Sequence, residues 1–243
     1  MNKFRLLSII PVIVMSMVKI ELISIPVSEN IVHYLFNGSF LLFAFVFLTP
    51  FVTMGRVKTF KSNTQHEIGE LVKEVNFPES IDVYLAKSFF AKNAATYYGW
   101  GNPVILIGES IYQSCTREQV KFLIYHEYCH IKNKHIVINF LSFFMCLILL
   151  PITMLILSPY LIEISLFFAI ALIFLSYMGG FLIHFYFARK RELQCDTYAT
   201  AHVGESVSKE TLQKLSKQND QNVKLVWFSS HPKLEMRLKN VSS

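Results

Sequence analysis

Four long apolar segments constrain the folding of this chain more than any other feature of its sequence. A helix needs about 20 apolar residues to cross a bilayer core of about 30 Å, because each residue adds about 1.5 Å along the helix axis. We therefore expect four membrane-spanning helices, at Phe4–Pro26, Tyr34–Met54, Ile136–Leu157 and Ile164–Phe187.

The first segment also allows a different interpretation. Lys19 and Glu21 interrupt it, and Lys3 and Arg5 precede it as basic residues precede the apolar region of a signal peptide. No small-residue cleavage pattern follows the apolar residues, so we expect an uncleaved helix.

The composition agrees with a membrane protein. Of the 243 residues, 53% are hydrophobic, and the mean hydropathy is +0.40, whereas soluble domains usually have about 45–50% apolar residues. The formal net charge is +6, but the basic residues cluster beside the apolar segments, which suits anionic lipid better than nucleic acid. We expect a lipid bilayer as a partner and no nucleic acid.

The positions of lysine and arginine orient the expected helices. Arg189, Lys190 and Arg191 follow the fourth segment, whereas the loop Ser158–Glu163 between the third and fourth segments has neither Lys nor Arg. Basic residues favour the cytoplasmic side of a membrane. We therefore expect a multi-pass protein of a bacterial inner membrane, with both termini and the large central polar segment in the cytoplasm.

The polar segments divide the chain into parts. We expect two membrane helices in residues 1–54, a cytoplasmic segment in 55–135, a membrane hairpin in 136–187 and a second cytoplasmic segment in 188–243. The two cytoplasmic segments would form one α+β domain within a mainly α membrane protein. Its small sheet is expected from three short runs between turn-forming residues, Asp82–Leu85, Ala94–Tyr97 and Val104–Ile107.

A helix with a metal-binding pattern is expected after the sheet. Thr116 and Gln119 have the spacing of a capping box, and apolar residues then recur at helical intervals. His126 and His130 are four positions apart on this helix, so both imidazoles can bind one ion. Glu127, about 100° round the helix from His126, can reach a metal-bound water as its base. Chance produces such a pattern only roughly 0.015 times in a chain of this composition.

Glu127 supplies a second argument for a metal site. It lies between Ile124 and Ile131 in the apolar stripe, where an unpaired carboxylate is costly. The alternative that stays open is a buried glutamate hydrogen-bonded to a neighbouring histidine without a metal. That alternative explains the two flanking imidazoles poorly.

A catalytic zinc ion usually has three protein ligands and one open position. His135 is near in sequence, but five residues beyond His130 on a continuous helix it points to a different face. Glu192 lies five residues after the fourth apolar segment, and His130 lies six residues before the third. At about 1.5 Å per residue the two side chains have similar heights above the expected membrane. We therefore predict Glu192 as the third ligand, and Asp196, one turn further, as the group that orients a ligand histidine.

Glu192 also has a simpler interpretation, which stays open. Arg189 and Arg191 are its neighbours, and exposed ion pairs of this kind are common and weak.

These motifs and their order resemble the HtpX-like and CAAX prenyl protease type of integral-membrane zinc metallopeptidase. The resemblance covers most of the chain and rests on Asn93-Ala94-Ala95-Thr96, His126-Glu127-Tyr128-Cys129-His130, Arg191-Glu192-Leu193-Gln194-Cys195-Asp196, and His231-Pro232 with Arg237. It implies a cytoplasmic zincin-like metallopeptidase domain attached to four membrane helices. It also implies one Zn²⁺ per chain with Glu192 as its third protein ligand.

The resemblance assigns further residues to substrate binding and catalysis. Asn93 would lie where the substrate backbone pairs as an added strand, and His231 and Arg237 would help to hold the developing oxyanion. The family usually has an aromatic residue at Ala95, so Asn93 is equally open as a turn asparagine. A surface turn is the alternative for His231.

None of the four cysteines belongs to a CxxC pair, and we expect all of them to be reduced. Cys129 and Cys195 lie within the ligand motifs, so contact of a thiolate with zinc has to be considered. Cys129 is one position from His130 and faces away from the shared histidine face, and the family usually has a small residue at Cys195. We expect both to be small buried side chains.

These observations predict a zinc-dependent endopeptidase that cleaves membrane or membrane-proximal proteins on the cytoplasmic side, as in protein quality control. Zinc would lower the pKa of its water towards about 7, and Glu127 would take the proton as that water attacks the peptide carbonyl. Both misfolded membrane proteins and a specific propeptide fit as substrates. Two alternatives stay open: a sensor-transducer metalloprotease of the antibiotic-receptor type, and a non-catalytic membrane scaffold.

Overall fold

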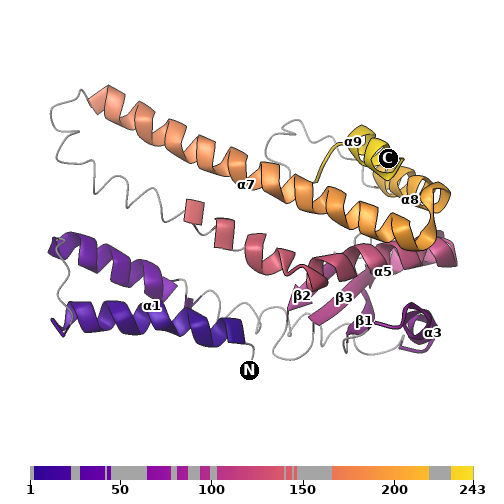
Figure 1. Cartoon of the computed structure of the whole chain (residues 1–243), viewed down its shortest axis with the longest axis horizontal. Helices are drawn as coiled ribbons and strands as arrows, with labels where there is room; N and C mark the ends of the chain where they lie inside the picture. Colours follow the sequence, from indigo (N-terminus) through magenta and orange to yellow (C-terminus); the bar gives the residue numbers. More distant parts are fainter. Residues whose placement is uncertain are drawn as a thin grey trace. The chain divides into compact units, whose positions relative to one another are not determined.

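The computed structural model describes residues 3–22, 28–41, 43–44, 65–77, 81–86, 94–98, 103–139, 141–143, 145–146, 166–218 and 231–242. The chain forms two compact units (Figure 1). The first comprises Met1–Val52 and Leu141–Phe181, and the second comprises Thr53–Phe140 and Leu182–Ser243. All the residues predicted to bind the metal lie in the second unit.

The first unit is helical in its described part. It contains helix α1 (Lys3–Lys19), a helical stretch at 29–41 and the beginning of helix α7 (Leu166–Val203). The chain leaves the helical conformation after Lys19, and Glu21 has a φ of 62°. The expected first helix therefore ends before Pro26.

The expectation of four membrane-spanning helices is wrong. Within the ranges that the structure describes, no helix combines the length and the apolar character needed to cross a membrane. Helix α1 has 17 residues, about 26 Å of helix, which falls short of a bilayer core of about 30 Å. Most of Tyr34–Met54 and Ile136–Leu157 lies outside the described residues.

The second unit contains the small sheet that the sequence predicts. Strands β1 (Asp82–Ala86), β2 (Ala94–Tyr98) and β3 (Pro103–Gly108) are arranged in the order β1-β3-β2. Strand β3 pairs parallel with β1 and antiparallel with β2, and its five consecutive buried residues suit the central position. The three predicted strands are confirmed, each with one or two additional residues. Strand β2 is an edge strand of the described sheet.

Helix α5 (Arg117–Lys132) carries the His-Glu-x-x-His pattern and packs against β2 and β3 (Figure 1). The side chain of Thr116 accepts a hydrogen bond from the backbone N–H of Gln119, whose side chain accepts one from the N–H of Thr116. The predicted capping box is thus confirmed. Helix α8 (Glu205–Gln218) also contacts α5. Contacts on more than one side explain why most of α5 is buried, including its polar residues.

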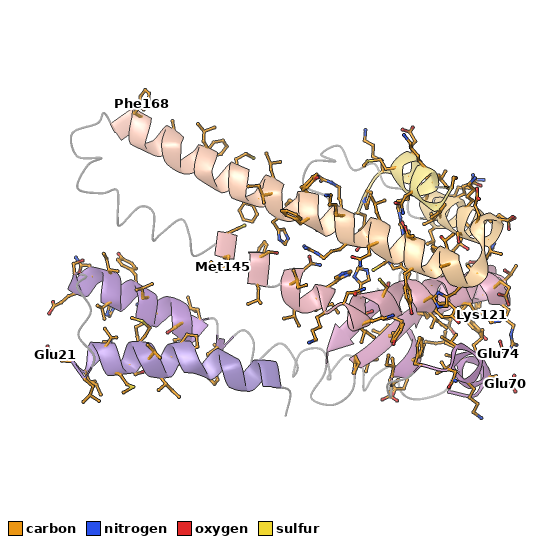
Figure 2. All side chains as sticks on the ribbon, in the orientation of Figure 1. Glu21, Glu70, Glu74, Lys121, Met145 and Phe168 are labelled. Atoms are coloured by element: carbon orange, nitrogen blue, oxygen red, sulfur yellow. The ribbon has the colours of Figure 1, made fainter. Side chains whose placement is uncertain are left out.

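Three further helices belong to the described part of the second unit, in addition to the part of α7 from Leu182 onward. Helix α3 (Gln65–Val75) contacts β1 and α5, α4 (Glu109–Ser114) follows β3, and α9 (Leu234–Val241) packs against α8. An exposed ion pair joins α3 to α5, where Nζ of Lys121 lies 3.0 Å from Oε2 of Glu74 (Figure 2). Exposed pairs of this kind contribute about 1 kcal/mol or less to stability, so the apolar core holds these helices together.

The chain turns sharply at the end of α5. Asn133 donates a hydrogen bond from Nδ2 to the carbonyl oxygen of Cys129 at 3.1 Å, and Lys134 adopts a left-handed φ of 55°. A new helical stretch begins at His135. The assumption of one continuous helix from His130 to His135 is therefore wrong, and the two rings meet edge-on with centres 5.2 Å apart.

Candidate metal centre

Two helices bring three potential metal ligands together. Helix α5 contributes His126 and His130, and α7 contributes Glu192. The Nε2 atoms of the two imidazoles are 3.3 Å apart. Oxygen atoms of Glu192 lie 3.5 Å from Nε2 of His126 and 3.4 Å from Nε2 of His130. All three residues are buried, with at most 8% of their surface exposed.

These separations fit a tetrahedral zinc ion. With bonds of about 2.0–2.2 Å, neighbouring ligand atoms of such an ion are about 3.3–3.6 Å apart. The distance between the two imidazole nitrogens, and the distance from each nitrogen to one of the two oxygens of Glu192, therefore lie in the range of such ligand separations. Two imidazole nitrogens and one carboxylate are also a ligand set that catalytic zinc sites use, with a fourth position left open. The residues thus fit a single zinc ion.

The two imidazoles differ in basicity. Burial alone would lower the pKa of His126, but its contacts with the carboxylates of Asp196 and Glu192 raise that pKa to about 10. Burial and the nearby charge of His126 lower the pKa of His130 to about 3. Burial opposes ionisation of Glu192, yet hydrogen bonds with His126 and His231 hold its pKa well below the usual value. Binding of a metal ion at Nε2 of His126 therefore releases a proton.

Asp196 supports His126 from behind. Its Oδ1 lies 3.0 Å from Nδ1 of His126, an ion-pair contact in which the N–H does not point straight at the carboxylate. Arg237 of α9 donates to both oxygens of Asp196, from Nε at 2.7 Å and from Nη2 at 2.6 Å. Asp196 is fully buried. Asp196 thus contacts Nδ1 of His126 while Nε2 of the same ring faces Glu192, and its orienting role stays a prediction.

Glu127 is held next to the ligand set by a residue of the sheet. Oγ1 of Thr96 in β2 donates to Oε2 of Glu127 at 2.6 Å and also lies 3.1 Å from the backbone oxygen of Glu127. Burial raises the pKa of Glu127, while the charge of His126 and the bond from Thr96 act in the opposite direction. A buried carboxylate with a raised pKa, adjacent to a metal ligand, is typical of a catalytic base.

His231 lies beside Glu192. Its Nδ1 is 2.9 Å from Oε2 of Glu192, and 55% of its side chain is exposed. The hydrogen bond with Glu192 raises the pKa of His231 despite partial burial. His231 therefore contacts a metal ligand and at the same time reaches solvent, which places it at the border of the site.

The remaining predicted residues have different outcomes. Arg237 was predicted to bind substrate, but the structure places its guanidinium against Asp196. Asn93 lies outside the described residues, so its role stays a prediction. The sequence analysis missed Thr96, although this residue closes the stretch that carries the family resemblance. Its signal was a hydroxyl-bearing residue in the expected strand Ala94–Tyr97, at the end of that stretch.

Comparisons with known proteins agree with this geometry. The sequence matches Peptidase family M48 over residues 60–243. A comparison with curated proteins finds no match. Among solved structures, the fold is similar to the crystal structure of Ste24p from S. mikatae, with a TM-score of 0.60 and 14% identity over 96% of this chain and 67% of the other. The match covers most of the chain and confirms the resemblance stated from the motifs. The chain belongs to Peptidase family M48 and is a zinc metallopeptidase.

Proposed function

We propose that this protein is a zinc-dependent endopeptidase in which Glu127 is the catalytic base. The observation that carries the proposal is the ligand set itself: the two imidazole nitrogens are 3.3 Å apart, each lies 3.4–3.5 Å from one of the two oxygens of Glu192, and the buried Glu127 is next to His126 in sequence. A structural zinc site would usually have four protein ligands, mostly cysteine. The set His126, His130 and Glu192 instead suits hydrolysis, which argues against the scaffold alternative.

The residues of the site have different roles in the proposed hydrolysis. Zinc, when bound by His126, His130 and Glu192, would supply Lewis acidity towards water and the substrate carbonyl. Glu127 takes a proton from the attacking water and returns it to the leaving amine. His231, beside Glu192 and open to solvent, is positioned to donate a hydrogen bond to the developing oxyanion. Arg237 acts through Asp196, because that pair keeps His126 oriented.

We propose that the substrate is an extended protein or peptide segment. Strand β2 has an unpaired edge in the described sheet, and Thr96 of this strand contacts the catalytic base. An extended chain that adds to this edge, near the predicted contact at Asn93, would pass next to the site. Substrates from the membrane, a location at a bacterial inner membrane and a cytoplasmic site stay predictions from the sequence. So does the sensor-transducer alternative.

Removal of the metal tests the proposed activity. We expect the full-length protein to cut an unfolded protein substrate at internal peptide bonds, to lose this activity on treatment with a zinc chelator, and to regain it when Zn²⁺ is added back. Mass spectrometry of the products checks the kind of cleavage. Release of terminal amino acids alone would contradict the endopeptidase assignment, and hydrolysis unaffected by the chelator would contradict the metal mechanism.

The hydroxyl of Thr96 provides a second test. We expect Thr96→Val to lower kcat about tenfold with unchanged zinc content, because a hydrogen bond to a charged group is worth about 1.5–3 kcal/mol. Thr96→Ser keeps the hydroxyl and should retain most of the activity. If the serine variant fell as far as the valine variant, packing of the methyl group rather than the hydrogen bond would explain the loss. Steady-state kinetics of both variants decide between these outcomes.

A further inference from the structure

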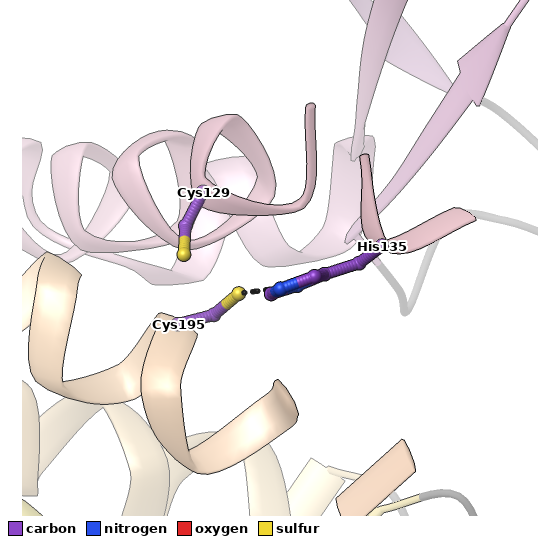
Figure 3. A group of neighbouring side chains, drawn as sticks. All are labelled: Cys129, His135 and Cys195. Atoms are coloured by element: carbon purple, nitrogen blue, oxygen red, sulfur yellow. Dashed lines mark hydrogen bonds between the residues drawn. The ribbon is translucent and has the colours of Figure 1, made fainter. Parts of the chain in front are cut away.

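A second cluster of potential metal ligands lies next to the first (Figure 3). It consists of Cys129, His135 and Cys195, which are 0%, 3% and 0% exposed. Their ligand atoms, the two Sγ atoms and one ring nitrogen of His135, all lie within 4.8 Å of one another. The cluster shares no residue with the set His126, His130 and Glu192.

Three separate parts of the chain build this cluster. Cys129 comes from α5, Cys195 from α7, and His135 from the helical stretch that follows the turn. The left-handed conformation of Lys134 interrupts the helix between α5 and His135, and the imidazole of His135 lies next to the thiol of Cys195. Figure 3 shows the three side chains pointing towards one another.

The spacing is suitable for coordination. Sγ of Cys195 lies 3.5 Å from Nδ1 of His135. A tetrahedral ion with a bond of about 2.3 Å to sulfur and about 2.05 Å to nitrogen separates these atoms by about 3.6 Å. In addition, Nδ2 of Asn133 donates to Sγ of Cys129 at 3.2 Å. Hydrogen bonds to a coordinating sulfur are a common support of thiolate metal sites.

Simple packing is the competing explanation for these residues. It accounts for two small buried cysteines, which is what the sequence analysis expected of Cys129 and Cys195. It gives no reason for a ring nitrogen of His135 to lie within 4.8 Å of both sulfur atoms, when the side chain of Gln194 already offers this imidazole a polar partner. The three ligand atoms converge as the atoms of a binding site do.

We propose that Cys129, His135 and Cys195 form a second metal site, which takes one soft transition-metal ion, Zn²⁺ or Cu⁺. Thiolate ligands select these ions over the harder ones. Each coordinating thiol gives up its proton when the metal–sulfur bond forms. The bound ion would link α5 to α7 beside the first site, since Cys129 precedes the ligand His130 and Cys195 lies between Glu192 and Asp196. It would thereby fix the distance between the helices on which the first site depends.

Cobalt substitution can distinguish the two sites. The first site offers only nitrogen and oxygen, so Co²⁺ bound there gives no thiolate charge-transfer absorption. We expect Co²⁺ added to the reduced, metal-stripped full-length protein to produce such a near-ultraviolet absorption, which reaches its maximum by two equivalents, with an intensity that corresponds to one thiolate-bound ion per chain. Displacement of this signal by Zn²⁺ and by Cu⁺, in separate titrations, identifies the preferred ion. This result does not depend on the proposed hydrolysis.

Single variants assign the signal to the cluster. Cys129→Ala and Cys195→Ala should lose the near-ultraviolet absorption but keep the visible bands of Co²⁺ at the first site, which show that the variant is folded. Cys115→Ala is the matched control, since Cys115 is a half-buried cysteine outside the cluster, and it should keep both signals. Glu192→Ala should lose the visible bands of the first site alone.

Two results would overturn the proposal. One is a wild-type protein that shows Co²⁺ bands of the first site without any thiolate absorption. The other is a protein purified under reducing conditions whose intact mass shows two hydrogens fewer, with Cys129 and Cys195 joined in one peptide. The second result would assign the pair to disulfide chemistry.

Discussion

Replacing Glu127 with Gln is expected to lower peptide hydrolysis about 10³-fold while the zinc content stays unchanged. General acid–base catalysis by a positioned side chain is worth about 10²- to 10⁴-fold. Glutamine has nearly the same shape and can still accept the hydrogen bond from Thr96. It cannot take a proton from water at neutral pH, however. Measurement of kcat and of bound zinc in the same preparation separates loss of the base from loss of the metal.

A matched control for this variant is Glu74→Gln. Glu74 has 43% of its side chain exposed, pairs with Lys121 on the surface, and lies on a different helix from Glu127. The control should keep wild-type activity and zinc content. Retention of full activity by the Glu127 variant would remove the assigned base from the mechanism, and loss of zinc would show that Glu127 contributes to the metal site itself.

Replacing Asp196 with Ala is expected to destabilise the protein by about 3–5 kcal/mol, because it leaves the guanidinium of Arg237 buried without its partner. The same change removes the group that orients His126 and should weaken zinc binding about 10- to 100-fold. Denaturant unfolding measures the first effect, and competition with a zinc chelator measures the second.

A double variant separates these two effects. Arg237→Met combined with Asp196→Ala removes the unpaired guanidinium of Arg237 and fills its space with an apolar side chain. The double variant should recover much of the lost stability, yet zinc binding should stay weak because His126 still lacks its support. If stability fell by less than about 1 kcal/mol in the single variant, the pair would contribute no more than an exposed ion pair. If zinc affinity recovered together with stability, Asp196 would have no orienting role.

The parts of the fold that depend on neighbouring residues could be predicted from the sequence. The capping box at Thr116, the three strands and the burial of Glu127 follow from local patterns, and the structure confirms them. The structure also brings Glu192 to the two imidazoles. The argument that led to Glu192 began from membrane helices that are not found in the described part of the chain. Hydropathy showed which segments are apolar but did not fix where each helix ends.

The features that the sequence did not reveal depend on contacts between distant residues. The direction of the His135 side chain follows from the left-handed turn at Lys134. Neither glycine nor proline occurs at this turn, so the sequence contains no usual signal for the end of a helix. The partner of Arg237 depends on how α9 packs, so the family motif named the residue without naming its contact. The hydrogen bond between the side chains of Thr96 and Glu127 joins residues that are 31 positions apart in the sequence. Patterns within a single helix or strand contain no information about such contacts.

The wide separation of the site's residues along the chain has a consequence for the timing of activity. The two histidines are synthesised well before Glu192, Asp196 and Arg237, so a growing or truncated polypeptide has only part of the ligand set. Peptidase activity therefore requires that the chain has been synthesised beyond Arg237 and that α5, α7 and α9 have packed together. Nascent chains and fragments that end before Glu192 should therefore be inactive, because the ligand set of His126, His130 and Glu192 is incomplete in them.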